Sequence, residues 1–275
     1  MKISIRMRQR LLVTIFLAIC SGALAQDASR NLGSAALASD ATLSDDHPTP
    51  GASAPAETDS HNPCGVRALG RETWWEAKQF GHGLAAAPRN SIRPSNLKWE
   101  LPIGAVTGIL IAKVDRTADN RIQLKSFQQL AGRWSNIGLE IELGSSVLAY
   151  GVGCAERRIY LRNTGFKMLA AMGAANTVDV AMKYAFDRQY AYAPNSTGKF
   201  WGGGRSFPSG HAATSFAFAA VIAHRYPHHA WLKWGAYALA TGVSLSRYPA
   251  KKHFPSDILV GATLGYVTGT YIADR

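Results

Sequence analysis

The chain has 275 residues, 47% of them hydrophobic, and its 30 basic and 18 acidic side chains give a formal net charge of +12. Such a length is enough for one sizeable folded domain, which excludes a peptide or a small disulfide-stabilised module. The positive charge favours anionic substrates or anionic lipid surfaces, and the lack of any recognisable nucleic-acid module argues against nucleic acid as a partner.

Residues 1–25 have the layout of a secretory signal peptide. Basic residues precede a short apolar run, Leu11–Ile19, and the segment ends in Ala23-Leu24-Ala25. Because the run is shorter than the ~20 apolar residues that a membrane span needs, we expect cleavage after Ala25 and export to the periplasm. An uncleaved membrane anchor is the alternative interpretation.

Residues 26–63 are rich in Ala, Ser, Asp, Thr and Pro and contain almost no large apolar side chains. Such a segment cannot bury enough surface to offset its chain entropy, so we expect a disordered linker. Cys64 and Cys154 remain after removal of the signal peptide. They can pair in an oxidising compartment or stay as two buried thiols, and the sequence does not supply the geometry that decides between these states.

From residue 64 onward the pattern is helical, because strand signals are scarce and Ala- and Gly-rich apolar stretches alternate with Pro, Gly and Asn. We expect an all-α fold, a helix bundle, with an N-terminal helical extension over residues 64–137 and a main domain over residues 138–273. The expected helices are Thr73–Gln79, Pro102–Val114, Ile122–Trp134, Gly138–Gly153, Gly165–Phe186, Gly210–Tyr226, Ala230–Tyr248 and Pro255–Ile272.

The relation of this bundle to a membrane depends on where its charges lie. The stretch Ile258–Ala273 has no charge but is short, and the helix expected over Gly165–Phe186 contains Lys167, Asp179 and Lys183. Charges near the centre of a spanning helix are costly. The pattern therefore favours a soluble or peripherally membrane-bound bundle, with a multi-pass membrane protein as the alternative.

A first chemical motif runs from Pro208 to His211 and opens a helical pattern. Ser209 is a candidate N-cap, and the free backbone amides of the first helical turn, together with the helix dipole, form a site for an anion. His211 then lies beside that anion. A capping or core role is the alternative for His211 when it is considered alone.

A second motif lies at the start of the last expected helix. His253 and Asp257 are four residues apart and so share one helix face, where Asp257 can accept a hydrogen bond from one ring nitrogen of His253. This contact fixes the tautomer and leaves the other nitrogen free to attack phosphorus. Arg247 ends the preceding helix, and its planar guanidinium suits bidentate contact with phosphate. The alternative is that His253 and Asp257 only cap the helix at the protein surface.

These residues match a known family. With Pro-Ser-Gly-His at Pro208–His211, and with Ser-Arg, five residues, His, three residues and Asp at Ser246–Asp257, the chain resembles the type-2 phosphatidic acid phosphatase and vanadium haloperoxidase superfamily. The resemblance covers about residues 140–272. It implies a helix bundle of that family's type.

The first motif of the family, Lys, six residues, Arg and Pro, is incomplete here. Lys183 matches the lysine, but Tyr190 stands at the arginine position and no proline follows it. Arg188, where many relatives carry an additional arginine, and Arg205, in the glycine-rich loop, are two candidate replacements for the missing cation.

The resemblance implies a role for each matching residue. His253 would be the nucleophile that forms a phosphohistidine, Asp257 would orient it, and His211 would protonate the leaving oxygen. The groups that hold the phosphate would be Lys183, Arg247, Ser209 and the amide of Gly210, with Arg188 as a further candidate.

We therefore expect an exported phosphatase for a phosphomonoester or pyrophosphate, of a soluble molecule or a membrane lipid, that needs no metal or other cofactor. The expected partners are that substrate and a peripheral membrane contact. Two alternatives remain: a vanadium-dependent haloperoxidase, since the same pocket can hold vanadate, and a phosphate- or lipid-binding relative without turnover, which Tyr190 motivates.

Overall fold

The computed structural model describes residues 64–90, 94–115, 124–193 and 196–275. This part of the chain consists of helices joined by turns and loops and contains no β-strand, which confirms the expected all-α fold. The signal peptide and the linker expected within residues 1–63 lie outside the described residues and stay predictions.

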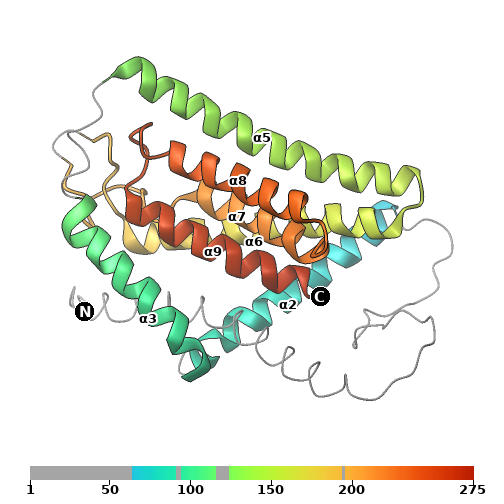
Figure 1. Cartoon of the computed structure of the whole chain (residues 1–275). Helices are drawn as coiled ribbons and strands as arrows, with labels where there is room; N and C mark the ends of the chain where they lie inside the picture. The colour runs from blue at the N-terminus through green and yellow to red at the C-terminus, as the bar shows by residue number, and fades with distance from the viewer. Residues whose placement is uncertain (1–63, 91–93, 116–123, 194–195) are drawn as a thin grey trace.

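The C-terminal helices of the described chain form the main bundle. They are α5 (Lys125–Ala155), α6 (Ile159–Phe186), α7 (Gly210–Arg225), α8 (Ala230–Ser246) and α9 (Pro255–Ala273). In Figure 1, α5 runs along the upper edge, and α7 lies between its neighbours, packed against α6, α8 and α9. The core of the bundle is built from small and aliphatic side chains of these helices, among them Ala217 and Leu264.

Small residues allow α7 and α9 to approach closely. Gly261, Gly265 and Gly269 recur every four residues, so they share one face of α9, and that face meets α7. A Cβ atom added at Gly265 would lie 2.1 Å from the backbone oxygen of Ala213. Since no side chain fits at that distance, glycine is required here, and it brings the N-terminal ends of the two helices side by side.

The N-terminal helices are α2 (Val66–Asn90) and α3 (Pro94–Ile109), and α3 continues into a π-helical turn, η1 (Leu110–Val114). In Figure 1, α2 and α3 lie below the main bundle. A disulfide joins Cys64, just before α2, to Cys154 near the end of α5, with a Cα–Cα distance of 5.9 Å. Of the two states open to these cysteines, the structure has the paired one.

The helix α5 differs most from expectation. The sequence pattern predicts two helices that meet near Gly138, at the expected boundary between extension and main domain, whereas the structure has one continuous helix, Lys125–Ala155. Gly138 lies inside this helix, where a Cβ atom would be 2.3 Å from Cγ2 of Val243 in α8. The glycine that resembles a helix break is a packing contact between α5 and α8.

Candidate active site

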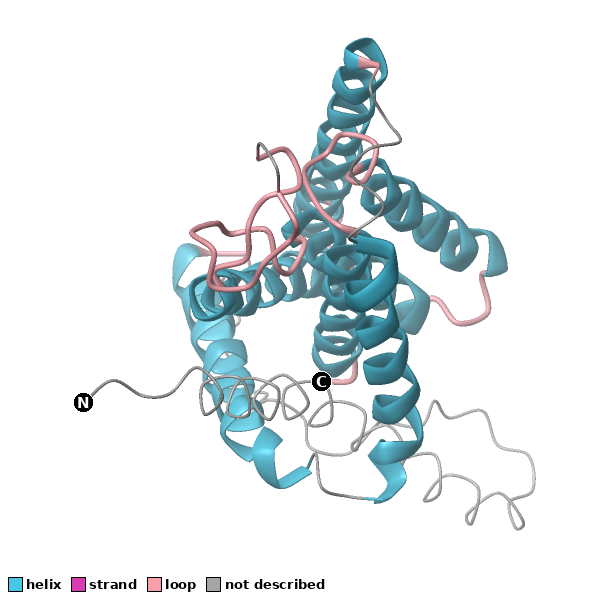
Figure 2. Ribbon diagram, turned by 90° about the vertical axis from the view of Figure 1, so that its left-hand side faces the viewer, coloured by secondary structure: helices cyan, strands magenta, loops and turns pink. Residues whose placement is uncertain are grey.

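The loops that join α6 to α7 and α8 to α9 lie together at one end of the bundle, the end that faces the viewer in Figure 2. These loops and the adjoining helix ends carry the residues of the motifs. Lys183 lies in the last turn of α6, His211 in the first turn of α7, Arg247 directly after α8, and His253 just before α9.

The structure brings these four residues into one cluster. Burial is the main cause that lowers the pKa of the His211 ring to about 3, and the neighbouring basic groups Arg247, His253 and Lys183 contribute to it. Burial also lowers the pKa of Arg247, to about 10. Nζ of Lys183 donates a hydrogen bond of 2.8 Å to the backbone oxygen of Pro208. Lys183 also forms an ion pair with the buried carboxylate of Asp179, one turn earlier in α6. Basic groups therefore gather at the N-terminus of α7 beside one carboxylate.

Two donors in this cluster have no hydrogen-bond partner among the described residues. They are Oγ of Ser209 and Nε of Arg247, both buried. Buried polar groups in proteins are nearly always paired, so two such groups in one cluster call for an explanation. Ser209 is also the N-cap residue of α7, beside the free amides of the first turn, including that of Gly210. All these groups suit the oxygens of a phosphoryl group.

The ring of His253 is held by the backbone. Its Nδ1 lies 2.7 Å from the backbone oxygen of Ser206 but 3.7 Å from Oδ2 of Asp257. Because a carbonyl oxygen only accepts, Nδ1 carries the proton, and the neutral ring has its lone pair on Nε2. This tautomer is the one expected for a nucleophile, but the expected direct hydrogen bond from Nδ1 of His253 to Asp257 is replaced by one to the backbone oxygen of Ser206.

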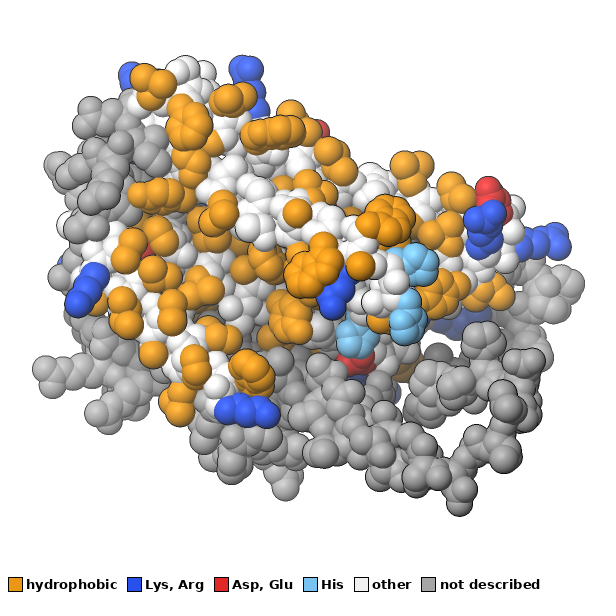
Figure 3. All heavy atoms as spheres, viewed as in Figure 1, with side chains coloured by type: hydrophobic (Ala, Val, Ile, Leu, Met, Phe, Trp, Pro, Cys, Tyr) orange, Lys and Arg blue, Asp and Glu red, His pale blue; other side chains and the backbone are white. Residues whose placement is uncertain are grey.

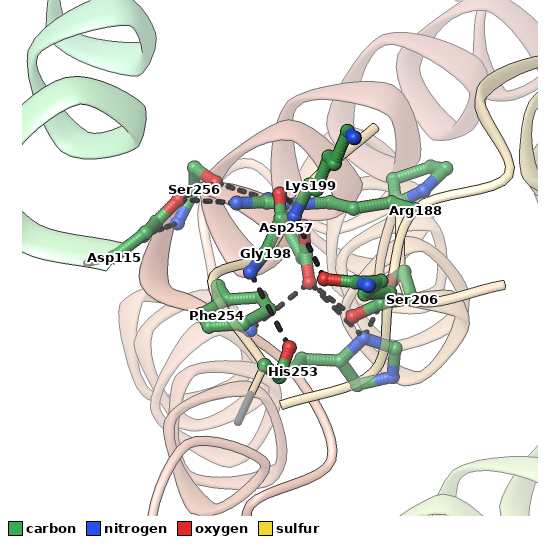
Figure 4. Close-up of polar contacts among 12 residues, drawn as sticks. Asp115, Arg188, Gly198, Lys199, Ser206, His253, Phe254, Ser256 and Asp257 are labelled. Carbon is green, nitrogen blue, oxygen red and sulfur yellow. Dashed lines mark hydrogen bonds and ion pairs between the residues drawn. The ribbon is translucent and has the colours of Figure 1, made fainter. Parts of the chain in front are cut away.

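Other donors occupy both oxygens of Asp257, as Figure 4 shows. Oδ2 accepts from Oγ of Ser206 at 2.5 Å and from the backbone N–H of Phe254 at 3.0 Å, and Oδ1 accepts from Arg188. Asp257 therefore orients His253 indirectly, by holding the residue whose carbonyl oxygen binds the ring.

Arg188 faces the protein interior, and the structure does not place it as a phosphate ligand. Its side chain is 1% exposed, and its guanidinium carbon lies 4.7 and 4.5 Å from the ring centroids of Phe200 and Phe254. Each of its three nitrogens donates to a protein acceptor, including the carboxylates of Asp115 and Asp257. Because all three nitrogens of this guanidinium are engaged, the structure gives no support to the phosphate-binding role expected for Arg188.

The position of the missing arginine is occupied by an aromatic pair. Tyr190 stacks on Tyr192 at a centroid distance of 4.9 Å. Arg205 is exposed, lies 4.2 Å above the ring centroid of Tyr184, and is close enough that its charge lowers the pKa of Tyr190, against a larger raising effect of burial. Of the two candidate replacements, Arg205 is the exposed one, next in sequence to Ser206.

Two site residues of α5 were not found from the sequence. Oδ1 of Asn136 lies 3.1 Å from Nε2 of His211, and Oγ of Ser135 accepts a hydrogen bond of 2.8 Å from Nη1 of Arg247. Neither belongs to a motif, so only the packing of α5 against α7 and α8 reveals them. In the described part of the chain, no group of three or more His, Cys, Asp or Glu side chains could hold a metal ion, and metal independence stays a prediction.

Comparisons with known proteins agree with the motifs. Residues 164–274 match the model of the PAP2 superfamily. Over 90 residues, the chain is 34% identical to a lipid A 1-phosphatase of Porphyromonas gingivalis; the match covers 32% of this chain and 18% of that protein. A crystal structure of a transmembrane PAP2-type phosphatidylglycerolphosphate phosphatase from Bacillus subtilis is similar with a TM-score of 0.49 and 20% identity, covering 62% of this chain and 92% of that one. Over residues 164–274, the chain is therefore similar to the PAP2 superfamily.

Proposed function

We propose that this chain is a phosphatase that transfers a phosphoryl group from a phosphomonoester or pyrophosphate to His253 and then to water. One observation carries the proposal: His253, with Nδ1 held by Ser206 and Nε2 available, shares a cluster with the two buried unpaired donors of Ser209 and Arg247. A nucleophilic nitrogen and donors for phosphoryl oxygens are therefore close together.

The proposed reaction has two steps. Nε2 of His253 attacks phosphorus while the bond from phosphorus to the leaving oxygen breaks, and protonated His211 gives its proton to that oxygen. Water then attacks the phosphohistidine, the phosphorus–nitrogen bond breaks, and neutral His211 takes the proton of the water. Lys183 and Arg247 offset the charge on the phosphoryl oxygens in both steps.

The proton on His211 is expected to arrive with the substrate. The pKa of about 3 keeps the ring neutral at neutral pH, and part of this lowering comes from Arg247, His253 and Lys183. A phosphate dianion bound among these groups offsets their charge and favours the protonated ring. Substrate binding therefore produces the acid that the first step needs.

An apolar surface supports a lipid substrate. Figure 3 shows hydrophobic side chains spread over α3, α5 and α8 with few charges among them. Only 22% of the most apolar window of α5 is buried, and this helix is long and apolar enough to cross a membrane. The exposed large hydrophobic side chains on these helices are Trp99, Leu101, Val106, Ile109, Phe127, Leu130, Trp134, Ile137, Ile141, Leu143, Val147, Leu148, Val152, Trp231, Trp234 and Leu245.

Two charged side chains of α5 and α6, Glu142 and Lys167, point inward, whereas Glu140 of α5 is exposed. Glu142 is fully buried and accepts a hydrogen bond from Ser215. Lys167 is buried and donates to the backbone oxygen of Ile272 at the end of α9. An apolar surface of this extent on a monomer marks a binding face for lipid or protein. We place it against the hydrocarbon of a membrane, which gives the site access to phosphorylated lipids, as the name of the Porphyromonas gingivalis relative also favours.

Export to the periplasm is part of the same proposal. The disulfide between Cys64 and Cys154 suits an oxidising compartment, and the first 25 residues have the layout of a secretory signal. Membranes from expressing cells test the lipid contact: the protein should stay in the pellet after carbonate and high salt and leave it only with detergent. Release by carbonate without detergent would mean that the protein is only peripherally bound to the membrane.

Phosphate release from the full chain in detergent tests the reaction. The panel contains phosphatidic acid, a lipid pyrophosphate, an aryl phosphate and an alkyl phosphate, with the His253→Ala variant as the control. We expect release from the lipid phosphates that vanishes in the variant and persists in EDTA. Release that survives His253→Ala would overturn the mechanism, and release from soluble esters alone would overturn the lipid substrate.

A further inference from the structure

The buried network behind His253 reaches a residue of the N-terminal helices. Asp115 directly follows η1 and is 1% exposed. Its Oδ2 accepts from Nη2 of Arg188 at 2.7 Å and from Oγ of Ser256 at 2.5 Å, and its Oδ1 accepts from the backbone N–H of Ser256 at 3.3 Å. Figure 4 shows Asp115 reaching the cluster from a separate segment of the chain.

A continuous series of contacts connects Asp115 with the nucleophile. Asp115 binds Arg188, Arg188 binds Asp257, Asp257 accepts from Oγ of Ser206, and the carbonyl oxygen of Ser206 accepts from Nδ1 of His253. The members are buried, so each has few other positions to adopt. A shift of Asp115 is therefore passed on to the imidazole ring.

The packing around Arg188 makes the series stiff. Gly198 has a φ of +65° and its carbonyl oxygen accepts from Nε of Arg188 at 3.0 Å. A Cβ atom at Gly198 would lie 2.9 Å from Nη2 of the same guanidinium. The ring centroids of Phe200 and Phe254 lie within 4.7 Å of the guanidinium carbon, so aromatic packing adds to these contacts.

The network also has an uneven charge. Asp115 and Asp257 supply two carboxylates against the single guanidinium of Arg188, and all three side chains are at most 1% exposed. Without Asp115, Arg188 would neutralise Asp257. With Asp115, one negative charge remains near a ring that becomes cationic when its Nε2 bonds to phosphorus. A buried negative charge stabilises that cationic state more than the neutral ring.

We propose that Asp115 is a positioning residue for the phosphatase reaction, acting on His253 through Arg188, Asp257 and Ser206. The inference rests on the function proposed above. It gives the N-terminal helices, which lie outside the family match over residues 164–274, a part in the chemistry of the site.

The test compares Asp115→Asn with Glu72→Gln in the full chain, using kcat and KM for an aryl phosphate and thermal unfolding in detergent. Asp115→Asn keeps the shape and removes the charge, so we expect kcat to fall about 10–100-fold with KM changed less than about twofold, as for a small misplacement of a reacting group. Glu72 pairs with Arg162 and joins α2 to α6 without touching the network. The Glu72→Gln substitution should lower the unfolding temperature and leave kcat and KM unchanged.

A double-mutant cycle shows whether the effect passes through the network. Ser206→Ala removes the hydroxyl that binds Asp257 but keeps the carbonyl that binds His253. If Asp115 acts through this series, the two single substitutions affect the same step of it. The product of their fold losses in kcat should then exceed the fold loss measured for the double variant. Independent, fully multiplicative losses would overturn the inference, as would equal kcat values for Asp115→Asn and Glu72→Gln.

Two further variants keep the test decisive. If Asp115→Asn does not fold, Ser256→Ala weakens the same junction by removing one hydroxyl, and an unchanged kcat in that folded variant would also overturn the inference. His253→Ala separates the two proposals. Full activity there refutes the phosphatase mechanism, whereas lost activity there with a normal Asp115→Asn enzyme refutes only the role of Asp115.

Discussion

The backbone oxygen of Ser206 lies 2.7 Å from Nδ1 of His253 and sets the tautomer of the proposed nucleophile. The sequence motif assigns this task to the carboxylate of Asp257, four residues after the histidine. In the structure that carboxylate holds the hydroxyl of Ser206 and the guanidinium of Arg188 instead. The relay through Ser206 changes what substitution of Asp257 is expected to do.

Asp257→Asn should damage the fold as well as the chemistry. The carboxylate accepts from Arg188, Ser206 and the N–H of Phe254, so an amide group must direct its NH₂ at a donor. Arg188 keeps its ion pair with Asp115, so the expected cost is that of a buried donor left without its acceptor, about 1–3 kcal/mol, and thermal unfolding in detergent measures it. A variant with wild-type stability and a purely kinetic defect would contradict the relay.

Gly265→Ala tests the contact between α7 and α9. A Cβ atom at Gly265 meets the backbone oxygen of Ala213 at 2.1 Å, whereas one at Gly242 on α8 meets nothing within 4 Å. We expect Gly265→Ala to lower the free energy of unfolding by about 1–3 kcal/mol or more. The control, Gly242→Ala, should leave it unchanged or raise it by up to about 1 kcal/mol. Equal effects would show that the close approach is wrong.

Cys154→Ser tests the disulfide. The bond to Cys64 closes a loop over a sequence separation of 90 residues, and loops of this size lose entropy worth about 4–5 kcal/mol in the unfolded chain when closed. The variant should unfold at a lower temperature than the wild type. Reductant should lower the unfolding temperature of the wild type to that of the variant and leave the unfolding temperature of the variant unchanged. A wild type insensitive to reductant would mean that the two thiols are free.

Phosphate binding should depend on pH through His211. Because the pKa of this ring is lowered to about 3 and a bound dianion raises it, the complex binds more protons than the free protein. Affinity for phosphate should therefore rise as pH falls from neutral to mildly acidic values, and calorimetry in buffers of different ionisation heat should detect proton uptake. His211→Gln should show only the titration of phosphate itself. Identical pH dependence in both proteins would remove His211 as the acid.

The parts of the site that lie close together in sequence were predictable. Ser209 and His211 begin one helix and His253 and Asp257 begin another, so local spacing alone places them beside free amides. Arg188 shows the limit of this reasoning: its sequence position indicates a cation near the site, but only its burial among Phe200, Phe254 and two carboxylates shows that the charge is already used.

The contacts made across the fold were not predictable. The group that holds His253 is a backbone oxygen, which any residue type supplies, and Ser135, Asn136 and Asp115 come from helices far earlier in the chain. The same limit applies to the exposed apolar surface. A count of charges treats a glutamate such as Glu142 as unfavourable for membrane contact. In the structure Glu142 is buried in the core, and most apolar side chains of α5 are exposed.

The phosphohistidine is the central claim, and it can be trapped directly. Full-length protein turning over an aryl ester of radiolabelled phosphate is quenched, and the labelled peptide is identified. The account predicts base-stable, acid-labile label on the peptide that contains His253, none in His253→Ala, and increased label in His211→Ala, which still expels a good leaving group but activates water poorly. Phosphate release by wild-type protein without label on His253, or release that persists in His253→Ala, would contradict it.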